Sequence, residues 1–101
     1  MGSLLKVSDI QKKVAVLGQQ YGAERIFLFG SYAKGEADED SDIDLRIDRG
    51  DVRGLMMGGL QVDLEDALGK RVDLVSTKAL RKDFLENIRK EEVLLYDRTR
   101  S

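Results

Sequence analysis

The sequence predicts a single α/β (α+β) domain in which a small mixed β-sheet is covered by helices. Three observations support this fold class. A chain of 101 residues can bury one modest core. Short apolar runs typical of strands alternate with segments of helical periodicity, and glycines or polar stretches separate them without any repeat. Such elements usually pack in two layers, so we expect one domain spanning 1–101, with flexible ends at 1–7 and 97–101.

The first two elements follow from local patterns. Ser8-Asp9-Ile10-Gln11 has the pattern of a capping box and is followed by apolar residues at helical spacing, so a helix is predicted to start at Ser8 and to stop at Gly22. The apolar run Arg25–Phe29 predicts a short buried strand that ends at Gly30. A polar stretch over 30–41 follows it.

The middle of the chain contains a strand and a helix. Ile43–Asp48 alternates apolar and charged residues with a period of two, which predicts a strand with one apolar and one charged face. A helix over 60–68 is predicted to end at Gly69. Glycines at 54, 58 and 59 make its start indistinct, because each interior glycine costs about 1 kcal/mol relative to alanine.

The C-terminal part predicts a strand, a helix and an edge strand. Residues 72–75 form the strand, and Ser76 or Thr77 is expected to cap a final helix that continues to residue 90. In that helix Leu80, Phe84 and Ile88 are expected to face the core. Residues 93–96 are expected to add the short edge strand.

Composition excludes several kinds of chemistry. The chain has no Cys and no His, so it contains neither a thiolate nucleophile nor an imidazole base or metal ligand. A net charge of −2 gives no overall attraction to nucleic acid or to anionic membranes. No apolar run reaches the roughly 20 residues of a membrane span, and no signal peptide is recognisable, so a cytoplasmic protein is expected.

Acidic residues concentrate between positions 36 and 44. Those at 36–40 lie in a polar turn and are interpreted as a solvated loop. Asp42 and Asp44 differ, because they share one face of a strand with Cα atoms roughly 6.5 Å apart, from where both carboxylates can bind one or two cations such as Mg²⁺. The alternative is a half-exposed strand that carries two surface acids.

Gly30-Ser31 precedes these acids at a turn that could bind phosphate. The glycine lets the backbone approach a ligand, Ser31 supplies a hydroxyl, and the next residues can open a helix whose free amides attract anions. A plain strand-ending turn is the alternative. Beside two carboxylates, the dipeptide indicates a phosphate site next to a metal site.

Gly30-Ser31, ten further residues and Asp42-Ile43-Asp44 resemble the signature of the polymerase-β-type nucleotidyltransferase superfamily. The run GSYAKGEADEDSDIDL is similar to the minimal nucleotidyltransferase (MNT) group, and the resemblance continues through GKRVDLVST and EEVLLYD. It implies a polymerase-β-like nucleotidyltransferase core. It also implies that Asp42 and Asp44 hold two Mg²⁺ ions, and that Asp73 completes the site and serves as base for the attacking hydroxyl.

Three basic residues are weaker candidates. Arg46 and Arg71 share strand faces with Asp44 and Asp73, and Lys34 lies in the loop on the phosphate side, so each could contact phosphate. Surface ion pairing is the favoured interpretation for all three. Tyr32 is interpreted as a packing or surface residue.

The resemblance implies a function. The expected reaction is attack of a hydroxyl on the α-phosphate of ATP, with AMP transferred to a tyrosine of a helical HEPN-family RNase toxin, so that this chain acts as its antitoxin. The small size predicts a second chain as partner. Two alternatives remain open: an antitoxin that inhibits by binding alone, and a transferase for a small molecule of the aminoglycoside kind. A nucleic-acid polymerase is disfavoured, because no basic stripe with interleaved aromatic residues is present.

Overall fold

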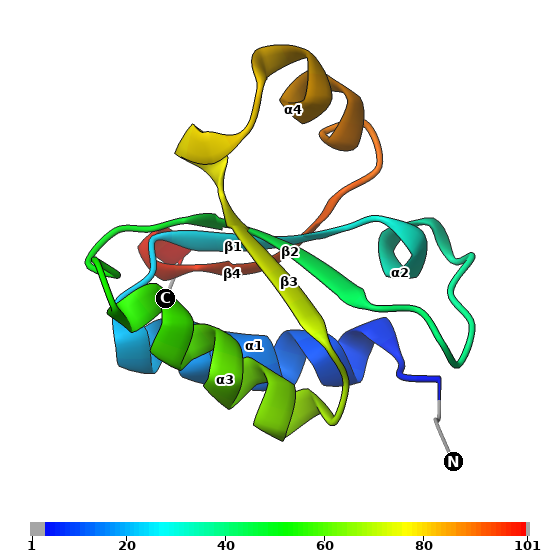
Figure 1. Ribbon diagram of the computed structural model, residues 1–101, viewed down its shortest axis with the longest axis horizontal. Coiled ribbons are helices and arrows are strands. Elements are labelled where there is room, and N and C mark those ends of the chain that lie inside the picture. The colour runs from blue at the N-terminus through cyan, green and yellow to red at the C-terminus, as the bar shows by residue number, and fades with distance from the viewer. Residues whose placement is uncertain (1–3, 101) are drawn as a thin grey trace.

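The computed structural model describes residues 4–100, so residues 1–3 and 101, at the predicted flexible ends, lie outside the described residues. The elements follow one another along the chain in the order α1 (Val7–Tyr21), β1 (Arg25–Phe29), α2 (Ser31–Lys34), β2 (Ile43–Asp48), α3 (Met56–Leu68), β3 (Val72–Ser76), the 3₁₀ turn η1 (Thr77–Ala79), α4 (Lys82–Ile88), β4 (Val93–Asp97) and the 3₁₀ turn η2 (Arg98–Arg100) (Figure 1).

The four strands form one mixed sheet with the order β3-β2-β1-β4. β1 runs antiparallel to both β2 and β4, whereas β2 and β3 are parallel. A parallel pair needs a crossover connection, and α3 supplies it between β2 and β3. The predicted α+β class with a small mixed sheet is therefore confirmed.

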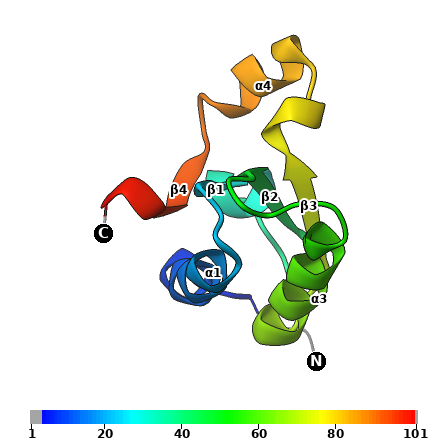
Figure 2. The same ribbon diagram turned by 90° about the vertical axis from the view of Figure 1, so that its left-hand side faces the viewer.

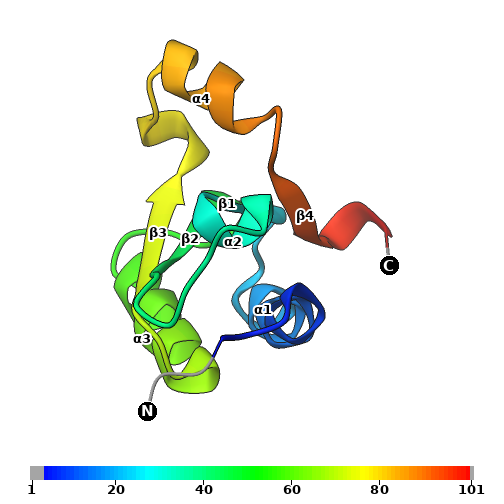
Figure 3. The ribbon, with the colours of Figure 1, turned by 90° about the vertical axis from the view of Figure 1, so that its right-hand side faces the viewer.

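Helices α1 and α3 lie side by side against one face of the sheet, and α4 stands on the opposite side (Figures 2 and 3). The core lies between the sheet and the helix pair. Its fully buried side chains come from both layers and include Ile10, Val14, Ile26, Leu28, Ile43, Leu45, Ile47, Leu60 and Leu64. Alternation along β2 places its apolar side chains in this core and leaves its charged side chains on the face toward α4.

The two helices of the core layer begin earlier than predicted. Lys6 occupies the N-cap of α1 and no side chain caps it, so the capping-box prediction at Ser8 is wrong. The partly buried Val7 packs against the core, which extends the helix by one residue. α3 starts at Met56 and tolerates the two interior glycines, because Leu60 and Leu64 are fully buried.

The predicted final helix is also wrong in its extent and its packing. The chain forms the short turn η1 and then a seven-residue helix, α4, with Arg81 as N-cap. None of the residues of α4 is buried, and Phe84 is 45% exposed. Because α1 and α3 already cover the core face, the segment after β3 rises from the other face (Figure 1).

Within residues 4–100, none of the helices combines the length and the apolar character that crossing a bilayer requires.

Candidate active site

Three rows of side chains cross the outer face of the sheet, which is the face toward α4. The pairing registers place Phe29, Asp44 and Asp73 in one row across β1, β2 and β3. The next row contains Phe27, Arg46 and Val75, and the third contains Asp97, Arg25 and Asp48. The acids of the sequence motif therefore lie at one end of this face, where β2 begins.

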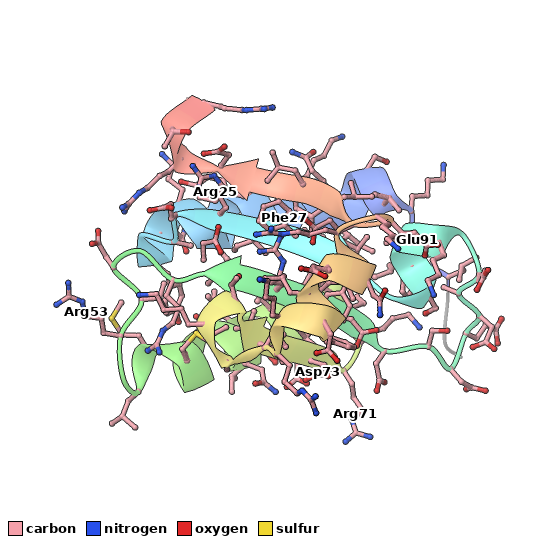
Figure 4. The ribbon with its side chains drawn as sticks, turned by 90° about the horizontal axis from the view of Figure 1, so that it is seen from above. Arg25, Phe27, Arg53, Arg71, Asp73 and Glu91 are labelled. Atoms are coloured by element: carbon pink, nitrogen blue, oxygen red, sulfur yellow. The ribbon has the colours of Figure 1, made fainter. Side chains whose placement is uncertain are left out.

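Asp44 and Asp73 are direct partners in the parallel β2–β3 pair. Neighbouring strands lie about 4.8 Å apart, so the two carboxylates start from adjacent positions on the same face. Asp42 immediately precedes β2 and is exposed. Asp73 is also exposed, between the buried Val72 and Leu74 (Figure 4).

The electrostatics of Asp44 connect the three acids. Burial raises the pKa of Asp44 above its ordinary value of 3.8, and the negative charges of Asp73 and Asp42 raise it further. The carboxylates thus lie close enough to repel one another. Such a group of oxygen ligands suits a hard cation such as Mg²⁺.

The acids do not form a closed cage in this conformation. Over residues 4–100, no three Asp, Glu, His or Cys side chains converge as a set that could already hold a metal ion. The strand register brings the backbones of Asp44 and Asp73 together, and the final convergence of their carboxylates then depends on side-chain rotation.

Gly30 brings the backbone against Asp44. It adopts φ 74° and ψ −153°, a conformation that favours glycine. A Cβ at this position would overlap Oδ2 of Asp44 and would lie 3.1 Å from Cγ of the same residue. Strand β1 therefore turns into α2 directly beside the acid.

Ser31 opens the four-residue helix α2 and is partly exposed. The amide of Lys34 donates to the carbonyl of Gly30 at 3.1 Å, which is the first hydrogen bond of this turn. The amides that precede it have no acceptor within the helix. These donors follow Gly30 directly, so a phosphate oxygen placed beside Asp44 can be bound by them.

The basic candidates behave differently from one another. Lys34 is exposed, and its Nζ lies 3.5 Å from Oε2 of Glu91, so surface pairing is confirmed for it. Arg71 is exposed and extends outward beyond the edge strand. Arg46 is not a surface residue: its side chain is 2% exposed, and its guanidinium is bound to Glu92 and Thr77. The structure thus corrects the surface interpretation of Arg46 and leaves its guanidinium occupied by protein groups.

A pocket of about 480 Å³ lies beside Gly30, between α2 and the segment that carries α4. Its lining is Phe29, Gly30, Lys34, Phe84, Asn87, Ile88, Lys90 and Glu91. The ring of Phe84 stands edge-on to that of Phe29 at 6.2 Å between centroids. Sequence reasoning missed the contribution of α4, because the spacing of Leu80, Phe84 and Ile88 resembles an ordinary core stripe. The exposed charges around them were the available signal.

Tyr32 is 4% exposed and packs with the core, so its interpretation as a packing residue is confirmed.

Comparison with known proteins places this arrangement in context. The family model described as "Polymerase beta, Nucleotidyltransferase" matches residues 11–101. The protein adenylyltransferase MntA of Thermococcus cleftensis is 38% identical over 78 residues, which cover 76% of this chain and 79% of the relative.

Two solved structures are similar over most of the chain. One, described as a minimal nucleotidyltransferase, superposes with a TM-score of 0.78 at 36% identity, over 91% of this chain and 98% of the other. A chain from a toxin–antitoxin crystal structure with AMP-PNP superposes with a TM-score of 0.75 at 26% identity, over 86% of this chain and 73% of the other.

Proposed function

The chain belongs to the polymerase beta nucleotidyltransferase family, and we propose that it is an adenylyltransferase that moves AMP from ATP to a hydroxyl group of a partner protein. The observation that carries this proposal is the in-register pair Asp44 and Asp73, placed beside the glycine turn at Gly30. A nucleotidyl transfer needs carboxylates next to amides that can bind phosphate, and the pair Asp44–Asp73 beside the free amides that follow Gly30 supports this assignment.

Asp42, Asp44 and Asp73 would hold Mg²⁺. Carboxylate oxygens are the ligands this ion prefers, and a cation among them would relieve the repulsion that raises the pKa of Asp44. When bound, a pair of such ions stabilises the charges on the attacking and leaving oxygens of a phosphoryl transfer.

The residues of the chain divide the remaining work. The acceptor oxygen attacks the α-phosphorus of ATP, the bond from that phosphorus to the bridging oxygen breaks, and pyrophosphate leaves. Asp73, exposed at the outer face, accepts the proton of the attacking hydroxyl. Ser31 and the free amides of α2 donate to phosphate oxygens. Lys34, on the same short helix, adds a positive charge to that side of the pocket.

The proposed acceptor is a tyrosine of a HEPN-family toxin, and the proposed biological role is that of its antitoxin in the cytoplasm, where ATP is available. Two findings support this. The relative from Thermococcus cleftensis is a protein adenylyltransferase, and the structural neighbour crystallised with AMP-PNP is part of a toxin–antitoxin complex. An antitoxin that inhibits by binding alone is the competing function, and the absence of a closed acidic cage over residues 4–100 is the observation that favours it.

The test combines labelling with growth. The chain is incubated with its neighbouring-gene HEPN protein, ATP labelled at the α-phosphate and Mg²⁺, and transfer of label to the partner is expected. Asp42→Asn/Asp44→Asn should abolish labelling and rescue of growth. Asp40→Asn makes the same type of substitution at one exposed position of the adjacent loop, and it should abolish neither. Growth rescue by the double variant at equal complex yield would establish inhibition by binding alone.

A further inference from the structure

Arg46 is the only charged side chain buried within residues 4–100, and it lies two positions along β2 from Asp44. Its guanidinium stacks on the ring of Phe27, with Cζ 3.9 Å from the ring centroid. Phe27 is its partner in the antiparallel β1–β2 pair, so both belong to the middle row of the outer face. A buried cation needs partners for its five donors.

One partner is Asp48 on β2 itself, whose Oδ1 lies 3.5 Å from Nη1 of Arg46. The hydrogen-bond partners come from the two ends of one segment, residues 77–92, which we call the arm. At the end of the arm, Nη2 and Nε of Arg46 donate to the two carboxylate oxygens of Glu92 at 2.6 and 3.1 Å. At its beginning, Nη1 donates to the hydroxyl of Thr77 at 2.9 Å. That hydroxyl in turn donates to Oδ1 of Asp48 at 2.6 Å. Arg46 therefore contacts both ends of the arm, and Asp48 binds the first of these ends as well.

The arm has little other attachment to the domain. Its helix, α4, contains no buried residue. Between the two ends, it meets the sheet through the edge-on contact of Phe84 with Phe29, and it meets α2 through the exposed pair of Lys34 and Glu91. An exposed ion pair of this kind contributes only about 0–1 kcal/mol. The buried fork between Arg46 and Glu92 is the more specific constraint, because its two parallel hydrogen bonds fix one geometry.

The arm also forms one wall of the pocket beside Gly30. Phe84, Asn87, Ile88, Lys90 and Glu91 line that pocket, and the opposite wall is formed by β1 and α2. The width of the pocket therefore depends on where the arm stands. Buried ion pairs are weak contributors to net stability but can select one arrangement over others.

We propose that Arg46 is a positioning residue: it holds both ends of the 77–92 arm and so sets the shape of the pocket beside Gly30, into which the nucleotide of the proposed reaction would bind. The identity of the ligand rests on the proposed function, whereas the attachment of the arm to Arg46 rests only on the contacts described above. Within residues 4–100, the hydrogen bonds and ion pairs of Arg46 join it to Thr77, Glu92 and Asp48, and none joins it to the three acids of the site or to Gly30. Arg46 therefore acts on the site through the arm.

The first measurement is hydrogen exchange in Arg46→Met without nucleotide. The amides of 82–92 are expected to exchange faster than in the original protein, while those of β1 and β2 keep their protection. The matched control is Arg25→Met, which removes another arginine from the same sheet face that pairs with Asp97 and Asp48. In that variant the arm should remain protected. Equal loss of protection in both variants, or none in Arg46→Met, would overturn the proposal.

The second measurement is calorimetric binding of a non-hydrolysable ATP analogue with Mg²⁺. If the arm occupies its proper position in about a tenth of Arg46→Met molecules, the dissociation constant rises about tenfold, because apparent affinity scales with the competent fraction. The dissociation constant of Arg46→Lys should lie between those of the original protein and of Arg46→Met, because a lysine keeps the charge but cannot form both parallel hydrogen bonds to Glu92. An unchanged dissociation constant in a variant whose arm exchanges faster contradicts the role in binding.

If Arg46→Met does not fold, Thr77→Val removes the hydroxyl that accepts from Arg46 and donates to Asp48 at the start of the arm, and it should loosen 77–81 with a smaller loss of affinity. If the original protein binds no ATP analogue at all, the proposed function fails, and hydrogen exchange still decides whether Arg46 holds the arm.

Discussion

The carboxylate of Asp44 lies against the Cα of Gly30, in the space that the Cβ of any other residue would occupy. The turn after β1 and the first acidic strand are therefore fitted to each other through one contact. This contact connects the phosphate-binding side of the candidate site with its acidic side. It also explains in steric terms why a glycine stands at position 30.

Gly30→Ala should remove activity and destabilise the protein by about 1–3 kcal/mol, because it combines an unfavourable positive φ with a clash against Asp44. Gly35→Ala is the matched control. Gly35 has nearly the same φ, 72°, at the other end of α2, and a Cβ there meets nothing within 4 Å. Its cost should be about 1 kcal/mol, with transfer activity retained. Urea unfolding and AMP transfer measured on both variants check this, and equal activities would refute the steric argument.

Asp44→Asn should stabilise the protein at pH 7 in the absence of divalent ions, while abolishing transfer. Because the folded state raises the pKa of Asp44, folding favours the protonated form. The contribution of protonated Asp44 to the free energy of unfolding is fully present below the ordinary pKa of 3.8, and it is lost as the pH rises through the raised pKa of the folded state. The difference in melting temperature between variant and original should thus be largest near neutral pH and disappear near pH 3.

Mg²⁺ should reverse that order. A ligand that binds only the folded state stabilises that state by mass action. Mg²⁺ should therefore raise the melting temperature of the original protein and leave the melting temperature of Asp44→Asn unchanged. Asp40→Asn should respond to Mg²⁺ as the original does, since Asp40 is an exposed loop residue. An equal Mg²⁺ response in all three proteins would place the ion elsewhere.

Phe84→Ala should cost about 0.5–1.5 kcal/mol, the value of an aromatic pair, because Phe84 is 45% exposed and contacts Phe29 edge-on. Leu64→Ala, in the fully buried stripe of α3, should cost about 2–5 kcal/mol. Chemical denaturation of the two variants compares them. A loss for Phe84→Ala as large as that for Leu64→Ala would mean that α4 belongs to the core after all.

Lys34→Met should leave stability within about 1 kcal/mol of the original, because its pair with Glu91 is exposed. It should nevertheless raise the KM for ATP, and the effect should diminish at high salt, since added ions screen an exposed charge. Steady-state kinetics at two ionic strengths test this. Glu91→Gln is the control, and it should have the opposite effect: it should lower the KM for ATP, because it releases Lys34 from its ion-pair partner.

Sequence periodicity predicts the strands and the existence of the two helices that cover them, but not where those helices begin. The alternation in Ile43–Asp48 separates a core face from a charged face, and the structure has both. The spacing of Asp42 and Asp44 placed both acids at the start of this strand, whereas Asp73, the partner of Asp44 on β3, was assigned from the family resemblance alone. In each case the decisive interactions are local or follow from strand register, which a pattern of period two records directly.

The failures involve contacts between distant parts of the chain. Arg46 reads as a surface charge on an alternating strand, and its burial depends on Glu92 and Thr77, which lie 46 and 31 residues away. Leu80, Phe84 and Ile88 have the spacing of a core helix, but α1 and α3 cover the core face of the sheet, so this segment does not pack there. Ser8 has the pattern of a cap, yet packing of Val7 moved the helix start. Periodicity carries no information about which face is already covered.

We expect this chain to transfer AMP to a partner protein at the site formed by Asp42, Asp44 and Asp73. The most direct measurement of this transfer is the intact mass of the HEPN protein after incubation with this chain, ATP and Mg²⁺, followed by peptide mapping of the modified residue. We expect a mass increase of one or more AMP groups, located on tyrosine, that is absent with Asp42→Asn/Asp44→Asn and present with Asp40→Asn. An unmodified partner that is nevertheless bound and inhibited by the chain would contradict it.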